Sequence, residues 1–465
     1  MAIEHKGEGR SNALRRVIDE REPVSLRTYT PTQLTIAKSA GVFHWTADGR
    51  KLYDYTSGVL VANLGHNPAP WQRKFAGYMG WLDTPTGDGY FESIPLTAYN
   101  AITTIEADAV RRLVAHLRSR PGGKRLEQIM WAASGSEAIQ KVLWAALAFD
   151  PTRDLIIATR DGFHGKKGLA EAVTGSERDK NRDPRVRFIS FPKDECRDVT
   201  LRDRPFDAAR YRAELEAIKS EQRGIACLIT EPYLGGGGSF HPPAAYLQML
   251  QDFCRANGAV FILDEIQSNF GRTGQMFAFE TYGLEPDIVV LGKGLGNGVP
   301  AACAAGRTDV FRALGFGEAS DTFSANPLCC AAVLATLDVF ESQDVLAGAR
   351  KSSAIIEDGL LALKELPFVS NVRGEKGGMV WGVEIEDWGG RTASEIARAC
   401  VLAAYQGDST GRAVHIMGPL AGRVLRISPP LTITEAEARE SIDVLTRCFA
   451  DLRLPVSERS ATTSA

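Results

Sequence analysis

The middle of the chain alternates short apolar runs with longer amphipathic stretches. The apolar runs predict buried strands at residues 128–134, 154–160, 186–192, 225–232, 259–266, 287–293 and 300–306. The amphipathic stretches between several of them predict helices at residues 136–149, 206–220 and 244–257. Apolar strands separated by helices are typical of a parallel sheet covered on both faces. This part of the chain is therefore expected to form a large α/β domain with a mixed, mostly parallel sheet.

The pattern changes after about residue 340. Helices are predicted at residues 327–342, 351–366, 393–405 and 434–452, and strands at 379–385 and 423–430. Residues 41–58 predict a hairpin that turns at Asp48–Gly49. We expect segments 1–60 and 336–455 to build a smaller α+β domain from both chain ends, beside a large domain of residues 61–335. Residues 1–10 and the tail 456–465 are expected to lack fixed structure.

Composition narrows the class of protein. Hydrophobic residues make up 44% and charged residues 24% of the 465 positions, with a formal net charge of -3, as in ordinary globular proteins. No basic excess indicates nucleic-acid binding, and no apolar run is long enough to span a bilayer. The polar start MAIEHKGEGR lacks the apolar core of a signal peptide. The eight cysteines form no CxxC pair, which favours a reducing, cytoplasmic compartment over disulfides or a metal site.

Two residues at predicted strand ends carry the most specific chemistry. Asp264 ends one apolar run, in ILDEIQSNFGRTG, and Lys293 ends the next, in VVLGKGLGNG. Ligands of open α/β sheets bind at the carboxyl ends of the strands, so both side chains are expected in one crevice. A lysine can form a Schiff base, and a carboxylate can keep a pyridine nitrogen protonated. Taken alone, Asp264 could instead be a capping residue and Lys293 a solvated loop lysine.

A candidate phosphate site lies in the sequence ASGSEA, residues 133–138. It follows a predicted strand and opens a predicted helix, where free backbone N–H groups favour an anion. Gly135 allows close approach of the backbone, and Ser136 adds a hydroxyl. The alternative is that Ser136 is a plain helix N-cap with Glu137 in the first turn.

These pieces, in this order, resemble the class III (omega) aminotransferases, which are fold type I enzymes dependent on pyridoxal 5'-phosphate (PLP). The resemblance covers roughly residues 29–451. Its motifs are SGSEA, then FHG at 163–165, EP at 231–232, DEIQSNFGRTG, GKGLGNGVP, TFSANP at 322–327 and LRISPPLTIT at 425–434. The resemblance implies a PLP-dependent enzyme with the two-domain fold expected above.

The resemblance also implies how the cofactor is held. Lys293 would form a Schiff base with PLP and later move protons, and Asp264 would pair with the pyridine nitrogen. Gly135 and Ser136 would bind the phosphate. Thr322 would reach the phosphate of a neighbouring subunit, which implies a homodimer with shared active sites, or two such dimers in a tetramer.

Further roles follow from the same resemblance. Phe163 and Ile266 would cover the two faces of the ring, Gln267 would contact the ring hydroxyl, and Glu231 would line the site. Arg426 resembles the family's arginine that binds a substrate carboxylate, for which its bidentate fork is suited.

Each of these roles has a simpler alternative. Phe163 and Ile266 could be core residues, Gln267 a surface amide, and Arg426 a structural ion-pair partner. His164 could orient the surroundings of the ring or only satisfy a loop.

The chain departs from the family pattern at two places. Many members that act on gamma- or omega-amino donors have a glutamate where Gly236 stands. Its absence argues against GABA-like or ornithine-like specificity and leaves Arg426 available to a carboxylate. Asp321 precedes Thr322 where small residues or histidine are usual, and Ala325 replaces a common glycine.

The expected reaction is transamination, in which an amino acid or amine donor passes its amino group to an oxo-acid acceptor, without a metal. The motifs leave two other reactions open on the same scaffold: amino-acid racemisation or epimerisation, and dialkyl amino-acid decarboxylation.

Overall fold

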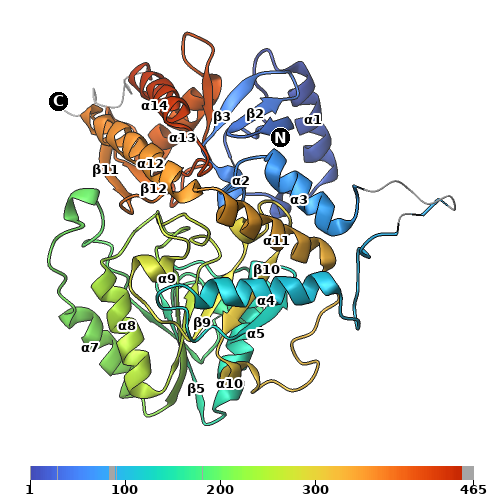
Figure 1. The fold of residues 1–465 in the computed structure, drawn as a ribbon. Coiled ribbons are helices and arrows are strands. Elements are labelled where there is room, and N and C mark those ends of the chain that lie inside the picture. The colour runs from blue at the N-terminus through green and yellow to red at the C-terminus, as the bar shows by residue number, and fades with distance from the viewer. Residues whose placement is uncertain (1, 29, 83–88, 91, 181, 453–465) are drawn as a thin grey trace, which may run out of the picture. The chain divides into compact units, whose positions relative to one another are not determined.

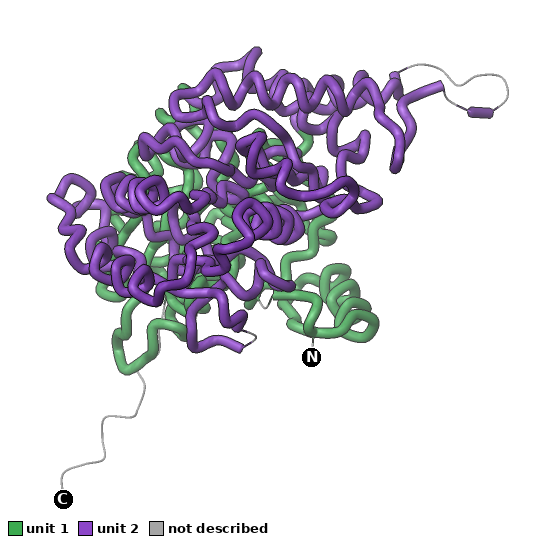
Figure 2. Tube along the Cα trace, turned by 90° about the horizontal axis from the view of Figure 1, so that it is seen from below, with its two compact units in different colours: residues 1–67, 347–465 green, residues 68–346 purple. Residues whose placement is uncertain are grey.

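The computed structural model describes residues 2–28, 30–82, 89–90, 92–180 and 182–452. The chain forms two compact units, residues 68–346 and residues 1–67 with 347–465 (Figure 2). The domain division expected from the sequence stays a prediction, and its boundary at residue 335 falls inside a helix that continues to Ser342. The tail 456–465 lies outside the described residues. Within the described ranges, no helix has the length and apolar character needed to cross a bilayer.

Residues 68–346 are built on one sheet of seven strands. Its strands, in spatial order, are β4 (Gln128–Ala132), β10 (Ala302–Gly306), β9 (Ile288–Leu291), β8 (Val260–Asp264), β7 (Gly224–Thr230), β5 (Arg153–Thr159) and β6 (Val186–Ile189). β10 runs antiparallel to β4 and β9, and the other neighbours are parallel. The mixed, mostly parallel sheet predicted from the apolar runs is confirmed.

Helices cover both faces of this sheet (Figure 1). Alternate strand residues point to opposite faces, so Ile157 and Phe261 enter one core while Ile156 and Ile262 enter the other. The first core is closed by α4 (Thr104–Arg118), α7 (Ala209–Lys219), α8 (Ala244–Asn257) and α11 (Pro327–Ser342). The second is closed by α5 (Gly135–Phe149), α6 (Gly168–Ala172) and α10 (Thr308–Phe311). α3 (Ala69–Met79) packs against α11, where Trp71 Nε1 donates to Thr336 Oγ1 at 2.9 Å.

The other unit joins the two ends of the chain through a sheet. Its strands, in order, are β1 (Ile36–Ala40), β2 (Phe43–Thr46), β3 (Lys51–Asp54) and β13 (Ala413–His415). β3 and β13 pair in parallel although they lie far apart in sequence, which confirms a small α+β part built from both ends. The predicted hairpin is β2–β3, whose turn contains Gly49 at φ +87°.

The rest of this unit is a three-stranded antiparallel sheet with flanking helices. The sheet contains β11 (Val369–Gly374), β12 (Trp381–Ile385) and β14 (Val424–Ile427). The helices are α1 (Gly9–Arg21), α2 (Ser57–Leu60), α12 (Val345–Ala362), α13 (Ala393–Gln406) and α14 (Glu435–Ala450). α13 and α14 each begin with a capping box, at Thr392 and Thr434.

The expectation that residues 1–10 lack fixed structure is wrong for residues 3–10. The carboxylate of Glu8 is buried, and its Oε2 lies 2.7 Å from Arg15 Nη2. Tyr405 Oη donates to the same carboxylate at 2.8 Å, and Arg50 Nη1 lies 2.5 Å from Glu8 Oε1. A buried charge is stable only when it is paired in this way, so the N-terminal segment is fixed by ion pairs rather than by an apolar face.

We predict that Glu8→Ala lowers the free energy of unfolding by about 3–5 kcal/mol, because it leaves Arg15 buried without its partner carboxylate. Glu4→Ala is the matched control. It breaks the exposed pair with Arg16 and should cost less than about 1 kcal/mol. Urea unfolding of both variants measures the difference, and equal losses would contradict the assigned role of Glu8.

Candidate active site

Asp264 and Lys293 lie at the ends of two neighbouring strands of the large sheet. Asp264 is the last residue of β8 and is buried. β8 and β9 are parallel with Asp264 opposite Val290, so both strands end at the same edge. Lys293 follows β9 as the first residue of the short 3₁₀ helix η3 (Lys293–Leu295) and is partly buried. Its φ of +48° is uncommon for a residue with a side chain, and such strained positions cluster at functional sites.

The Asp264 carboxylate is held by hydrogen bonds to both oxygens. The backbone N–H of Ile266 donates to Oδ1 at 3.0 Å, and Nδ1 of His164 lies 2.8 Å from Oδ2. Because a carboxylate accepts, His164 donates from Nδ1. His164 is buried in turn, and its backbone N–H donates to Thr174 Oγ1 at 2.8 Å. His164 thus holds the Asp264 carboxylate, and its role near a cofactor ring stays a prediction.

The candidate phosphate site is the beginning of α5. The helix is capped by Ser134, whose Oγ accepts from the Glu137 N–H at 3.3 Å. The alternative that Ser136 is the N-cap is therefore wrong. The Glu137 carboxylate folds back to accept from the Ala133 N–H at 3.0 Å. Gly135 and Ser136 are the first two residues of the helix, and their N–H groups have no carbonyl four residues earlier within it.

Glycines let the segments around this edge approach each other closely. A Cβ on Gly135 would lie 2.8 Å from Ile266 Cδ1, and one on Gly292 would lie 3.3 Å from Ile266 Cγ2. Ile266 therefore lies against both the start of α5 and the residue preceding Lys293.

Gly165 and Gly235 allow two further segments to approach the ends of β8 and β9 closely. A Cβ on Gly165, at φ +146°, would lie 2.6 Å from Ser136 Oγ. A Cβ on Gly235 would lie 2.0 Å from Gln267 Oε1. The segments that contain Ser136, His164 and Gln267 are thus gathered at the ends of β8 and β9.

Glu231 ties two of these segments together. It is buried, and its two oxygens accept from the backbone N–H groups of Phe163 at 2.9 Å and Gly235 at 3.2 Å. Burial raises the pKa of the Glu231 carboxyl to about 7. The nearby His164 lowers this pKa, whereas the negative charge of Asp264 raises it further. Phe163 itself is 46% exposed, so the alternative of a core phenylalanine is wrong.

Two of the residues predicted from the sequence are not part of this cluster. Thr322 is exposed in the segment that precedes α11, outside the hydrogen-bonded network around Asp264. Arg426 lies on β14, in the other compact unit, where it is buried and its Nη2 is 2.9 Å from Met417 Sδ. Gly236 is exposed, and a Cβ added to it would make only an ordinary contact, at 3.4 Å from Phe163 Cβ.

One residue of the region was not found from the sequence. Lys141, on α5, is buried and donates to Trp131 O at 2.8 Å, Asp321 Oδ2 at 2.6 Å and Ser324 Oγ at 3.0 Å. The only sequence signal was the unusual acid at 321, which gave no indication of its partner.

Comparison with known proteins finds a matching protein family and sequence relatives that span most of the chain. The family model described as "Aminotransferase class-III" matches residues 84–449. The chain is 28% identical to the 4-aminobutyrate aminotransferase of Mycobacterium leprae, over 90% of this chain and 91% of that protein. It is 29% identical to the 2-aminoadipate transaminase of Pseudomonas putida, over 92% and 98%.

Solved structures share the fold of this chain. The thermostable (S)-enantioselective omega-transaminase from Thermomicrobium roseum superposes with a TM-score of 0.78 at 24% identity, over 95% of this chain and 99% of that chain. An amine transaminase from an uncultivated Pseudomonas species, in its PLP-bound form, gives a TM-score of 0.74 at 26% identity, over 93% and 97%.

The raised pKa of Glu231 predicts a pH-dependent stability. The folded protein binds this proton more tightly than the unfolded chain, whose carboxyl has a pKa near 4.5. The contribution of Glu231 to the free energy of unfolding is therefore fully present below pH 4.5. This contribution, roughly 1–3 kcal/mol, is lost as the pH rises through about 7. Glu231→Gln should unfold with a flatter pH profile between pH 5 and 8, whatever its absolute stability. Parallel profiles of the two proteins in urea would show that Glu231 does not titrate there.

Proposed function

Because the chain belongs to the class III aminotransferase family, and is therefore a PLP-dependent aminotransferase, we propose that Lys293 holds the cofactor and that Asp264 controls its ring. The observation that supports this assignment is the arrangement at one sheet edge. A partly buried lysine and a buried, doubly hydrogen-bonded carboxylate follow adjacent parallel strands, beside the beginning of a long helix.

The residues present fit PLP. The cofactor supplies an aldehyde that condenses with amines and a pyridine ring that withdraws electrons. Its phosphate requires N–H donors, which the first residues of α5 offer, and its ring nitrogen requires an acceptor, which Asp264 offers. Gly135 and Gly165 leave no room for a side chain at this place, since a Cβ on either would lie under 3 Å from its neighbours. These features are those of a compact site in which backbone and ligand approach closely.

In this proposal Asp264 keeps a proton on the ring nitrogen. Its negative charge is stabilised by the donors His164 Nδ1 and Ile266 N–H, which also fix the direction of the carboxylate. His164 is thus a positioning residue that acts through Asp264. Lys293 would provide the amine that attaches the cofactor, and its Nζ would also be the group that moves the proton of the substrate carbon.

The side chains around the ring complete the proposed site. Ile266, which packs between Gly135 and Gly292, would cover one face of the ring. Phe163, whose backbone is held by Glu231, would cover the other face. Gln267 would contact the ring hydroxyl.

The amino group passes from an amino donor to an oxo-acid acceptor. Racemisation and decarboxylation, which the motifs alone left open, gain no support, because the relatives reported above are named aminotransferases or transaminases. We propose that Arg426 binds a substrate carboxylate. Gly236, which stands where many gamma- and omega-amino enzymes have a glutamate, leaves this arginine without its competing acid in both half-reactions.

We further propose a homodimer, or a pair of such dimers, in the cytoplasm. Thr322 is exposed and would bind the phosphate of the neighbouring subunit. The eight cysteines are all free thiols, and seven are buried, as expected in a reducing compartment.

The covalent link is tested directly. Borohydride reduction of the holoenzyme should fix a pyridoxyl label on the peptide that contains Lys293, as read by mass spectrometry. Lys293→Ala should fold but lose turnover by at least about 10³-fold, measured as amino transfer to 2-oxoglutarate or pyruvate. Lys219→Ala, on the exposed face of α7, is the control and should keep full activity. A label on a different lysine would overturn the assignment.

The substrate role of Arg426 has its own test. Arg426→Ala should raise the barrier for donors that carry a carboxylate by about 2–5 kcal/mol in kcat/KM, because a buried charge pair is lost. A simple amine without a carboxylate should lose far less. Arg426→Lys should recover part of the loss for the carboxylate donors. Equal losses for both donor classes would assign Arg426 a structural role instead.

A further inference from the structure

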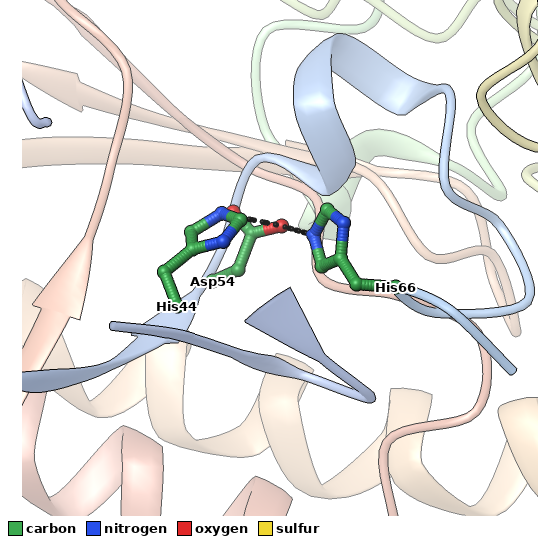
Figure 3. Close-up of side chains that lie close together, drawn as sticks. All are labelled: His44, Asp54 and His66. Atoms are coloured by element: carbon green, nitrogen blue, oxygen red, sulfur yellow. Dashed lines mark hydrogen bonds and ion pairs between the residues drawn. The ribbon is translucent and has the colours of Figure 1, made fainter. Parts of the chain in front are cut away.

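Three side chains meet far along the chain from Lys293, in the unit that contains the β2–β3 hairpin. His44 lies on β2, Asp54 ends β3, and His66 follows α2. Figure 3 shows the two imidazole rings directed at Asp54 from opposite sides. Their Nε2 atoms lie 3.4 Å (His44) and 2.7 Å (His66) from the same oxygen, Asp54 Oδ2. One potential ligand atom from each of the three residues thus lies within 4.8 Å of the other two.

Among the described residues, the carboxylate of this cluster has histidines as its ion-pair partners. Asp54 is fully buried, and no lysine or arginine among the described residues forms an ion pair with it. Buried carboxylates are normally paired with a cation or coordinate a metal.

We propose that His44, Asp54 and His66 bind one divalent transition-metal ion of the Zn²⁺ class. Two imidazole nitrogens and one carboxylate oxygen form a ligand set that Zn²⁺ accepts, with water in the fourth position. Tetrahedral ligands at 2.0–2.1 Å from the metal are about 3.3 Å apart. The 3.4 Å separation of His44 and Asp54 matches this value, and the His66 pair would open by roughly 0.6 Å as the metal replaces a shared proton.

The surroundings orient these ligands as metal sites require. Nδ1 of His44 lies 2.7 Å from Ser39 Oγ, so Nε2 is the nitrogen left to face the ion. Asp54 Oδ1 accepts from the backbone N–H and the hydroxyl of Thr56, at 2.8 and 2.7 Å, which leaves Oδ2 as a single ligand atom. Such outer partners usually fix ligand orientation. His66 is the most accessible of the three ligands, with 16% of its side chain exposed, compared with 3% for His44.

Other potential ligands compete poorly. The cysteines form no cluster with histidines or acids in the part of the chain that the structure describes. Burial also raises the thiol pKa values, to about 12 for Cys227 and about 11 for Cys329, so these thiols stay protonated near neutral pH. The bound ion would join β2, β3 and the segment after α2, and would stabilise this unit by mass action.

The test uses untagged holoenzyme that has been treated with a chelator and then titrated with Zn²⁺. We expect one Zn²⁺ per chain by elemental analysis and calorimetry, and a saturable rise in thermal midpoint. His44→Gln and His66→Gln should lose both effects. His116→Gln, which removes a histidine far along the chain from the cluster, is the control and should keep both.

Two measurements keep the proposal testable if the histidine variants fail to fold. Ser39→Ala leaves all three ligands in place and should weaken Zn²⁺ binding by about 10-fold or more. Co²⁺ in the wild-type protein should give the visible bands of a four-coordinate ion without a thiolate charge-transfer band. No stoichiometric Zn²⁺ uptake, or uptake unchanged in Ser39→Ala or in His44→Gln, would overturn the site. In that case the cluster is a hydrogen-bonded histidine–carboxylate network only.

Discussion

The parallel pairing of β8 with β9 is the constraint on which the candidate active site depends. It places Asp264 opposite Val290, so the carboxylate and the amine of Lys293 leave the sheet at the same edge. Ile266 links this edge to α5, because it fits between Gly135 and Gly292 while its N–H holds Asp264. A Cβ at Gly135 would lie 2.8 Å from Ile266 Cδ1 and would require this side chain to shift, whereas one at Gly292 would make a tight contact of 3.3 Å. Both glycines therefore set the packing around Ile266.

The helices of the large unit could be predicted where residues that begin or end a helix stand at both of its boundaries. α8 and α11 begin and end as predicted, because Pro243 and Gly258 flank α8 and Asn326 caps α11. α1 was missed for a physical reason. Its buried residues are polar and its stability comes from the Glu8 ion pairs, so it has no apolar periodicity to detect. The helices α3 and α4 were also missed, although the cap at Thr103 was a usable signal.

The residues of the candidate site could be predicted where the chemistry requires a particular residue type at the end of a strand. They could not be predicted where a residue's role depends on a partner far away in the sequence. Asp264 and Lys293 follow apolar strands, so their shared edge could be inferred. The contact of His164 with Asp264 could not be inferred, because it is a single hydrogen bond between residues 100 positions apart. The pairing of Lys141 with Asp321 spans 180 residues. The cluster of His44, Asp54 and His66 could not be predicted from the sequence either. The β2–β3 pairing brings the strands of His44 and Asp54 together, and a separate bridge to Gly41 positions His66.

The acid at position 321 shows how a departure from a family pattern can be compensated elsewhere in the chain. A partly buried carboxylate beside Thr322 needs a cation, and Lys141 on α5 supplies it at 2.6 Å. The same helix begins with Gly135 and Ser136, the proposed phosphate ligands. The ion pair, with Ser324 as a further partner, therefore fixes the segment that carries Thr322 to α5, the helix that begins with these proposed ligands. Asp321 is thus no argument against the proposed role of Thr322, because it anchors the segment from which that hydroxyl would reach the neighbouring subunit.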